Sequence, residues 1–312
     1  MSAADTLRGL YHLFTDRKTG HVETVSPKPR KTAPWLKDGQ PLVSKVQASG
    51  DIRGDVAECL GLLGGLDRAI SPGDKVLVKP NFNSPDPFPG STDLGFLQAV
   101  LEILKETGAE IVVGESAGGI WRPTRNTVAK LGALDLLEEL GVGFVAFDAG
   151  ETDWVEVPIE GEFLPAVTVP RVAYEADRLV YLPCMKTHKY ARFTLALKLY
   201  MGFVHPADRL GFHRSNLEQK VSEINLAWQP DLIVMDGRKA FVAGGPERGQ
   251  LVEPGIIMAS GDLVAIDVEG LKVLQSFQAN NRLDGDPYEL PQIATALRHG
   301  LTAGEGDYRV VE

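Results

Sequence analysis

Along residues 42–277, short apolar runs alternate with longer segments in which apolar residues recur at the spacing of an α-helix. The runs are rich in Val, Ile and Leu, which predicts buried β-strands. The longer segments predict amphipathic helices. Buried strands separated by single helices are typical of a parallel sheet with helices on both faces. The sequence therefore predicts an α/β fold with a mostly parallel sheet.

The individual elements follow from the same pattern. The predicted strands cover 42–48, 75–79, 110–113, 143–147, 179–182, 232–235 and 256–259. The predicted helices cover 55–70, 93–107, 124–140, 194–200, 217–228 and 263–277. Two further apolar stretches, 154–158 and 166–169, indicate a short hairpin-like insertion.

Residues 1–40 differ from the rest of the chain. They are basic, rich in Pro and Thr, and without apolar periodicity, which predicts a flexible or surface-wrapping arm. The arm either packs on the body of its own chain or contacts a partner protein or a second subunit of a homo-oligomer. Residues 41–312 are predicted to form a single α/β domain with a small insertion near 150–170.

Composition narrows the classes of function. The 312 residues carry a formal net charge of −10, which argues against nucleic-acid binding but leaves room for a local cationic pocket. Cys59 and Cys184 are the only cysteines, and an iron–sulfur cluster takes about four thiolates. No run approaches the ~18 apolar residues of a membrane helix, and the N-terminus lacks the apolar core of a secretory signal. We therefore expect a cytoplasmic protein without an iron–sulfur cluster or a membrane partner.

Polar and ionisable residues follow the predicted strands. In an open α/β sheet, ligands bind beyond the carboxyl ends of the strands, so these side chains should converge on one rim. The set is Lys79, Asn81, Glu115, Ser116, Asp148, Lys186, His188, Asp236 and Asp262. Asp and Asn are also common turn residues, which explains Asp148 or Asp262 equally well without a site. Lys79, Lys186 and His188 are not turn formers and favour a site.

Positive charge gathers in the stretch LPCMKTHKYARFTLALKLYMG. The predicted strand-to-helix junction carries Lys186, His188, Lys189 and Arg192, and Lys198 lies in the helix. Such a cluster at a helix N-terminus suits a small anionic ligand. Nearby ammonium groups would keep His188 neutral, as a base or a metal ligand, and would lower the pKa of a lysine. A solvated basic patch and an ordinary surface position for Lys198 are the simpler alternatives.

A divalent metal is compatible with the sequence, although no motif fixes one. The candidate ligands are His188, His213 and Asp236, and neither HExxH nor CxxC spacing occurs. The segments GLLGGLD and ESAGGIW match neither the dinucleotide nor the P-loop pattern. The loop AGGPERG is either a lid or a connection. Cys184 is either a reactive thiol or a buried structural cysteine.

Several separate blocks of the sequence occur in the order seen in a known family. They are KPNFNSP, GSTD, VVGESAGG, PCMKTHKYARFTLALKLYMGFV, LEQKVSEINLAWQPDLIVMDG and SGDLVAIDVEG. Together they resemble the domain of unknown function 362 (DUF362) family over roughly residues 42–280. The most specific parts are KTH…TLALK, PDLIVMDG and the closing Asp262-to-Asp267 spacing.

The resemblance implies a fold akin to the N-terminal domain of nickel-dependent lactate racemase. It also implies a lysine-and-histidine site for a small carboxylate, with an organometallic or other cofactor. Many relatives carry a ferredoxin-like segment with iron–sulfur cysteines, which this chain lacks. Leu199 stands where an asparagine usually follows the TLALK lysine.

Two hypotheses about function follow. The first is an enzyme acting on a small carboxylate- or phosphate-bearing metabolite, in which Lys186 and His188 bind the anion and move a proton. Glu115 and Asp236 would act as acid, base or metal ligand. The predicted substrate-binding residues are Lys79, Asn81, Ser116 and Lys198. The second hypothesis is a non-catalytic protein that carries a metabolite, metal or cofactor. Charges of both signs at one cleft favour the enzyme.

Overall fold

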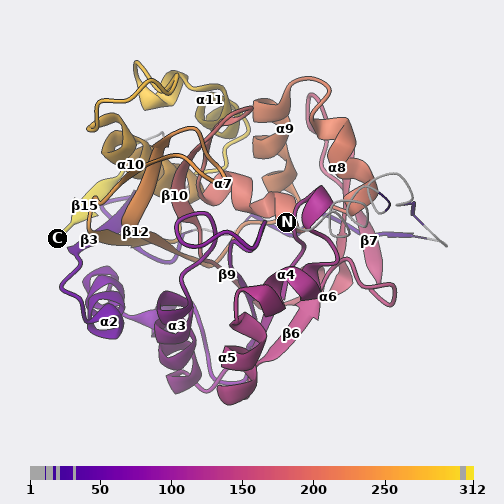
Figure 1. Cartoon of the computed structure of the whole chain (residues 1–312), viewed down its shortest axis with the longest axis horizontal. Coiled ribbons are helices and arrows are strands. Elements are labelled where there is room, and N and C mark those ends of the chain that lie inside the picture. Colours follow the sequence, from indigo (N-terminus) through magenta and orange to yellow (C-terminus); the bar gives the residue numbers. More distant parts are fainter. Residues whose placement is uncertain (1–10, 12–16, 19–21, 31–32, 303–306) are drawn as a thin grey trace.

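The structure is a computed structural model that describes residues 11, 17–18, 22–30, 33–302 and 307–312. Its main sheet has the strand order β15–β3–β14–β12–β9–β4–β5–β6, and Figure 1 labels β15, β3, β12, β9 and β6 of this sheet. In chain order these strands are β3 (Gln40–Gln47), β4 (Lys75–Lys79), β5 (Glu110–Glu115), β6 (Gly143–Ala146), β9 (Arg178–Tyr181), β12 (Leu232–Ala243), β14 (Ile256–Ser260) and β15 (Arg309–Val311).

The predicted α/β fold is confirmed, and the parallel part of the sheet is its centre. β12, β9, β4, β5 and β6 run parallel to one another. β14 is antiparallel to both of its neighbours, β12 and β3. The chain returns from β12 to β14 through a short connection that contains β13 (Gln250–Val252). Such a short return brings the next strand back antiparallel, because a parallel strand needs a longer crossover.

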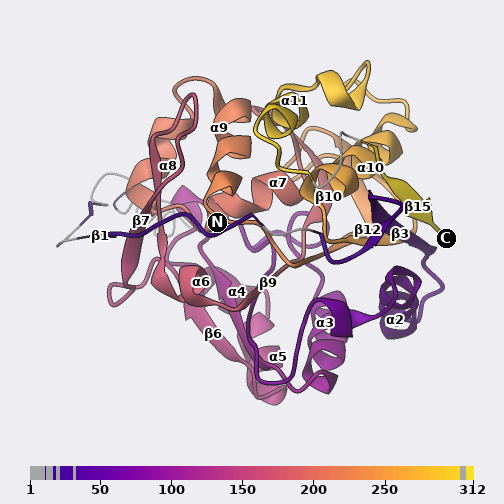
Figure 2. The ribbon, with the colours of Figure 1, turned by 180° about the vertical axis from the view of Figure 1, so that it is seen from behind.

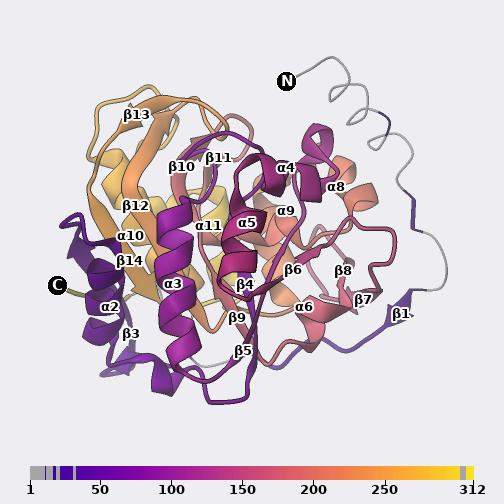
Figure 3. The ribbon, with the colours of Figure 1, turned by 60° about the horizontal axis from the view of Figure 1, so that its bottom comes forward.

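Helices cover both faces of the sheet, as Figure 1 and Figure 3 show. One face packs against α2 (Ile52–Leu63), α3 (Leu94–Glu106), α4 (Thr124–Lys130) and α5 (Ala133–Glu139). The other packs against α7 (Ala196–Leu199), α9 (Leu217–Glu223), α10 (Leu263–Gln275) and α11 (Pro291–Arg298). Strand β4 supplies both cores: Val76 and Val78 face the first layer and Leu77 the second. This alternation follows from the two-residue repeat of a β-strand.

A small second sheet lies beside the main one. It consists of β1 (Glu23–Thr24), β7 (Trp154–Pro158) and β8 (Ala166–Pro170), and Figure 2 shows β1 and β7 at that edge of the molecule. β7 and β8 pair antiparallel, and β1 adds to β7. Within the predicted arm, the Lys18 ammonium donates to Thr168 Oγ1 at 2.6 Å and pairs with Asp208. Residues 1–10, 12–16, 19–21 and 31–32 of that arm lie outside the described residues.

Four predicted helices differ from the structure. Those predicted over 55–70 and 217–228 end earlier as α-helices, at Leu63 and Glu223. The helix predicted over 124–140 is divided into α4 and α5 at Gly132, whose backbone is left-handed with φ of 79°. The helix predicted to start at Thr194 starts later, because the chain first forms a hairpin of β10 (Cys184–His188) and β11 (Arg192–Thr194). β10 pairs with β12, which continues well past its predicted end at Met235.

The remaining elements are short. They are β2 (Leu36–Lys37), α6 (Arg171–Glu175), α8 (Pro206–Phe212) and the 3₁₀ turns η1 (Leu66–Arg68), η2 (Gly119–Trp121), η3 (Tyr200–Gly202), η4 (Ile224–Leu226) and η5 (Pro287–Glu289). Of these, η2, η3 and α8 border the candidate site described below.

The closing Asp262-to-Asp267 motif has a structural role. The Asp262 carboxylate accepts the backbone N–H groups of Val264 and Ala265 and so begins α10. The fully buried Asp267 accepts the N–H groups of Ala196 and Leu197 at 2.7 and 2.9 Å. These are the first residues of α7, so Asp267 fixes the start of the helix that carries Lys198.

Asp267 makes the stability of the protein depend on pH. Burial raises the pKa of Asp267 to about 7. The pKa of an aspartic acid in the unfolded chain is about 3.9. The folded state therefore binds this proton more tightly, and the contribution to stability is fully present below about pH 4 and lost as pH rises through 7.

We expect Asp267→Asn to remove this dependence. Urea denaturation between pH 4 and pH 8 should show the unfolding free energy of the wild type falling relative to that of Asp267→Asn, by up to ~4 kcal/mol at about 1.4 kcal/mol per pKa unit. A wild-type unfolding free energy that stays constant, or rises, relative to that of Asp267→Asn over this pH range would contradict a raised pKa of Asp267 in the folded protein.

Candidate functional site

A cavity of about 850 Å³ opens at the carboxyl ends of β4 and β5 and against β10, α7 and α8. The structure brings most of the sequence-predicted site residues to its wall. These are Lys79, Asn81, Glu115, Ser116, Lys186, His188, Lys198 and His213. Strand order explains the convergence: β4 and β5 are adjacent and parallel, so Lys79 and Glu115 end side by side.

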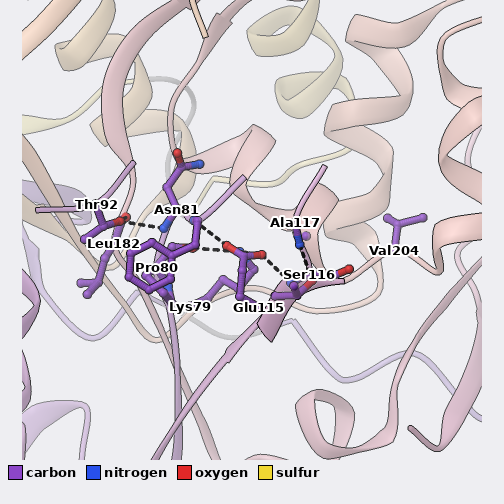
Figure 4. Close-up of polar contacts among 12 residues, drawn as sticks. Lys79, Pro80, Asn81, Thr92, Glu115, Ser116, Ala117, Leu182 and Val204 are labelled. Carbon is purple, nitrogen blue, oxygen red and sulfur yellow. Dashed lines mark hydrogen bonds and ion pairs between the residues drawn. The ribbon is translucent and has the colours of Figure 1, made fainter. Parts of the chain in front are cut away.

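A buried ion pair forms the floor of the cavity. Lys79 Nζ lies 2.6 Å from Glu115 Oε1, and the two side chains are 1% and 2% exposed. The Glu115 carboxylate also accepts the backbone N–H groups of Phe82 and Ser116, as Figure 4 shows for Ser116. Lys79 Nζ donates to the carbonyl of Pro80 at 2.8 Å. Burial lowers the pKa of Lys79, and Glu115 opposes that shift. Both groups are thus held by the protein's own atoms.

Lys186 is buried beside this pair without a carboxylate of its own. Its Nζ donates to Asn81 Oδ1 at 2.8 Å and to the Gly90 carbonyl at 2.5 Å. Both acceptors are neutral, and burial lowers the pKa of Lys186. The neighbouring Cys184 thiol is also buried, and its pKa is raised to about 11. The structure therefore favours the structural interpretation of Cys184.

Lys198 differs from Lys79 and Lys186 in its bonding. It is half-buried on α7, and no hydrogen bond or ion pair joins it to another residue that the structure describes. Burial lowers the pKa of Lys198 to about 8, and the positive charge of Lys186 adds to the shift, while Glu247 opposes it. At pH 7, about a tenth of Lys198 is therefore the free amine, far more than for an ordinary lysine.

His188 has a fixed tautomer. Its Nδ1 accepts the backbone N–H groups of Tyr190 and Ala191 at 3.2 and 3.0 Å. Burial lowers the pKa of His188, and the charge of Lys198 lowers it further. We infer that the ring is neutral, with its proton on Nε2. At this site His188 is then a hydrogen-bond donor, whereas the sequence suggested a base or a metal ligand.

Ser116 and Arg209 complete the wall. The Ser116 hydroxyl is buried and has no hydrogen-bond partner among the described residues. The Arg209 guanidinium on α8 donates to the carbonyls of Ser116, Ala117 and Gly202. Sequence reasoning missed Arg209, because it lies on a helix far from any predicted strand end.

Glu247 is the second residue that sequence reasoning missed. It lies in the loop AGGPERG and lines the cavity. Its charge acts on both Lys186 and Lys198. The loop packs closely on β10, since a Cβ on Gly245 would lie 2.0 Å from the Thr187 carbonyl oxygen. The loop therefore belongs to the wall of the site.

Asp236 does not reach the cavity. Its carboxylate is buried in an ion pair with Arg238 at 2.7 Å, and Arg238 also contacts Asp93 at 2.8 Å. Burial raises the pKa of Asp236, and Arg238 opposes the shift. The predicted metal ligands His188, His213 and Asp236 are not assembled, and within the described part of the chain no three His, Cys, Asp or Glu side chains are grouped to hold a metal ion.

Comparison with known proteins places the chain in a family. Residues 76–272 match the family described as Domain of unknown function (DUF362), and the chain belongs to it. A thylakoid-associated protein of Synechocystis sp. is 27% identical over 275 residues, which cover 85% of this chain and 80% of that protein. In the described residues, no helix is long and apolar enough to cross a membrane. The cytoplasmic location stays a prediction.

Among solved structures, the lactate racemase apoprotein from Thermoanaerobacterium thermosaccharolyticum is similar, with a TM-score of 0.43 and 15% sequence identity. The similarity covers 77% of this chain and 58% of that one.

Gly202 tests how tightly the floor is packed. A Cβ at this position would lie 2.5 Å from Glu115 Oε1 and 2.6 Å from Lys79 Nζ, so Gly202→Ala must displace the ion pair. We expect it to lower the unfolding free energy by about 1–3 kcal/mol in urea denaturation.

The matched control is Gly211→Ala on α8, where an added Cβ meets nothing within 4 Å. Because alanine favours a helix over glycine, this variant should be unchanged or up to ~1 kcal/mol more stable. Equal stability of the two variants would contradict the close packing around Lys79 and Glu115.

Proposed function

We propose that the protein is an enzyme acting on a small metabolite that bears a carboxylate or phosphate group. The observation that carries the proposal is the pair Lys186 and Lys198, which share one cavity while no carboxylate of the described residues bonds to either. Placing two ammonium groups out of bulk water costs free energy unless negative charge compensates them. A bound anion would supply that charge.

Each residue then has a distinct task. The Lys186 ammonium and the Nε2–H of His188 donate hydrogen bonds to the anion, and the unpartnered Ser116 hydroxyl is a further donor. Lys198, with a pKa of about 8, strengthens anion binding as an ammonium. In the smaller fraction of molecules in which it is the free amine, Lys186 and His188 hold the anion and Lys198 acts as the base that removes a proton from the substrate and returns it. Proton movement at a carbon next to the anionic group fits this set. Lys79 and Glu115 form the floor of the cavity as a buried ion pair.

A non-catalytic carrier of an anionic metabolite is the second candidate. It is favoured by the bonds that already occupy Glu115 and the Nδ1 of His188, since neither group is then available for proton transfer. The carrier and the enzyme share the anion site and differ only in what Lys198 does.

Lys198→Met tests the anion site, because methionine retains the apolar stem and removes the charge. Using inorganic phosphate and acetate as probes in isothermal titration calorimetry, we expect at least about tenfold weaker binding, or about 1.4 kcal/mol. Wild-type binding should weaken as pH rises through about 8, when Lys198 loses its proton. This loss of affinity near pH 8 should be absent from Lys198→Met.

The control is Lys239→Met, at an exposed lysine paired with Glu253. This variant should bind both probes like the wild type.

Two results would contradict the proposal. One is that Lys198→Met binds both probes as well as the wild type does; the other is that neither these probes nor the longer anions of the series below bind the wild type. Enzyme and carrier are separated by incubating the protein with small carboxylates in D₂O. Deuterium incorporation that depends on Lys198 supports the enzyme, and binding without incorporation supports the carrier.

A further inference from the structure

Exposed apolar side chains gather at the mouth of this cavity. Ile120, Tyr190 and Leu210 are 36%, 62% and 43% exposed, and all three line the same cavity as Lys186 and Lys198. Large apolar side chains left in water at one place commonly mark a binding surface.

The three side chains come from separate parts of the chain. Ile120 lies on η2, which follows β5, Tyr190 lies in the turn between β10 and β11, and Leu210 lies on α8. The fold therefore brings them together, and no single amphipathic segment accounts for the cluster. The half-buried Trp121 and Met201 also line this cavity and add to its apolar surface.

The apolar mouth directly adjoins the cationic floor. The Tyr190 ring centroid lies 6.1 Å from that of His188 and 6.1 Å from that of His213. The backbone N–H of Tyr190 also donates to His188 Nδ1. The cavity volume of about 850 Å³ falls in the range of roughly 300–1,000 Å³ that proteins use to bury organic ligands. An inorganic anion or acetate would leave most of this volume unfilled.

We infer that the ligand of this site is an amphipathic organic anion. Its carboxylate or phosphate head lies at Lys186 and Lys198, and an apolar chain or ring of several carbons lies against Ile120, Tyr190 and Leu210. The placement of the anionic head group rests on the proposed function. The apolar tail of the ligand is the new inference. A docked protein partner would use the same exposed side chains without needing the lysines below them.

The test is a chain-length series measured by isothermal titration calorimetry on the full chain. The probes are acetate, butyrate and hexanoate, the methyl, butyl and hexyl monophosphates, and uncharged hexanol. We expect affinity to rise by up to about fourfold for each methylene buried, in both series or in the one whose head group fits. Hexanol should not bind measurably, because it lacks the charge that Lys186 and Lys198 require.

Two leucine variants locate the tail. Leu210→Ser should weaken hexanoate or hexyl phosphate about fivefold to tenfold, on the order of one to two buried methylenes, and leave the short anions unchanged. The matched control is Leu251→Ser on β13, where the leucine is 49% exposed and does not line the cavity. It should change neither.

The outcomes separate the two proposals. Equal affinity for short and long anions overturns the apolar tail and leaves the anion site standing. Equal weakening by Leu210→Ser and Leu251→Ser, or hexanol binding as tightly as hexanoate, also overturns it. If no anion of either series binds, the proposed function itself fails and this inference fails with it.

Discussion

The buried ion pair of Lys79 and Glu115 is the interaction on which the site depends. The two residues end adjacent parallel strands, and the pair is isolated from water, so neither charge is stable there without the other. The Glu115 carboxylate also fixes the backbone of Phe82 and Ser116, and Gly202 packs against the pair without room for a Cβ. One pair thus joins the sheet to the segment between α7 and α8 and sets the floor of the cavity.

Because Lys79 already neutralises Glu115, that carboxylate does not balance the other lysines of the cavity, and Glu247, the other carboxylate in the lining, is bonded to neither Lys186 nor Lys198. Lys186 is held by two neutral oxygens, and Asp267 fixes the helix that carries Lys198. Positions held by the protein before a ligand arrives reduce the entropy that binding costs. The excess positive charge is therefore preorganised, and in our proposal it selects an anion.

Most of the site's framework could be predicted from the sequence, because it depends on patterns within short segments of the chain. Apolar periodicity identified strands such as β4, and parallel strands place Lys79 and Glu115 on one rim. The β10–β11 hairpin escaped prediction because it depends on the long extension of β12, a non-local contact. Asp236 was expected at the site, but Arg238, two residues further on, draws its carboxylate away. Glu247 reaches the cavity through loop packing that residue spacing does not encode.

The central claim is that Lys198 is a cation to which no carboxylate of the described residues is bonded, so that it can bind an anion. NMR titration of the lysine side-chain amino groups, with Lys198 assigned by its absence from Lys198→Met, tests this directly. The account predicts that Lys198 titrates near 8 and that its pKa rises when inorganic phosphate is added. A Lys198 that titrates at the ordinary lysine value of about 10.4, unmoved by phosphate, would contradict it.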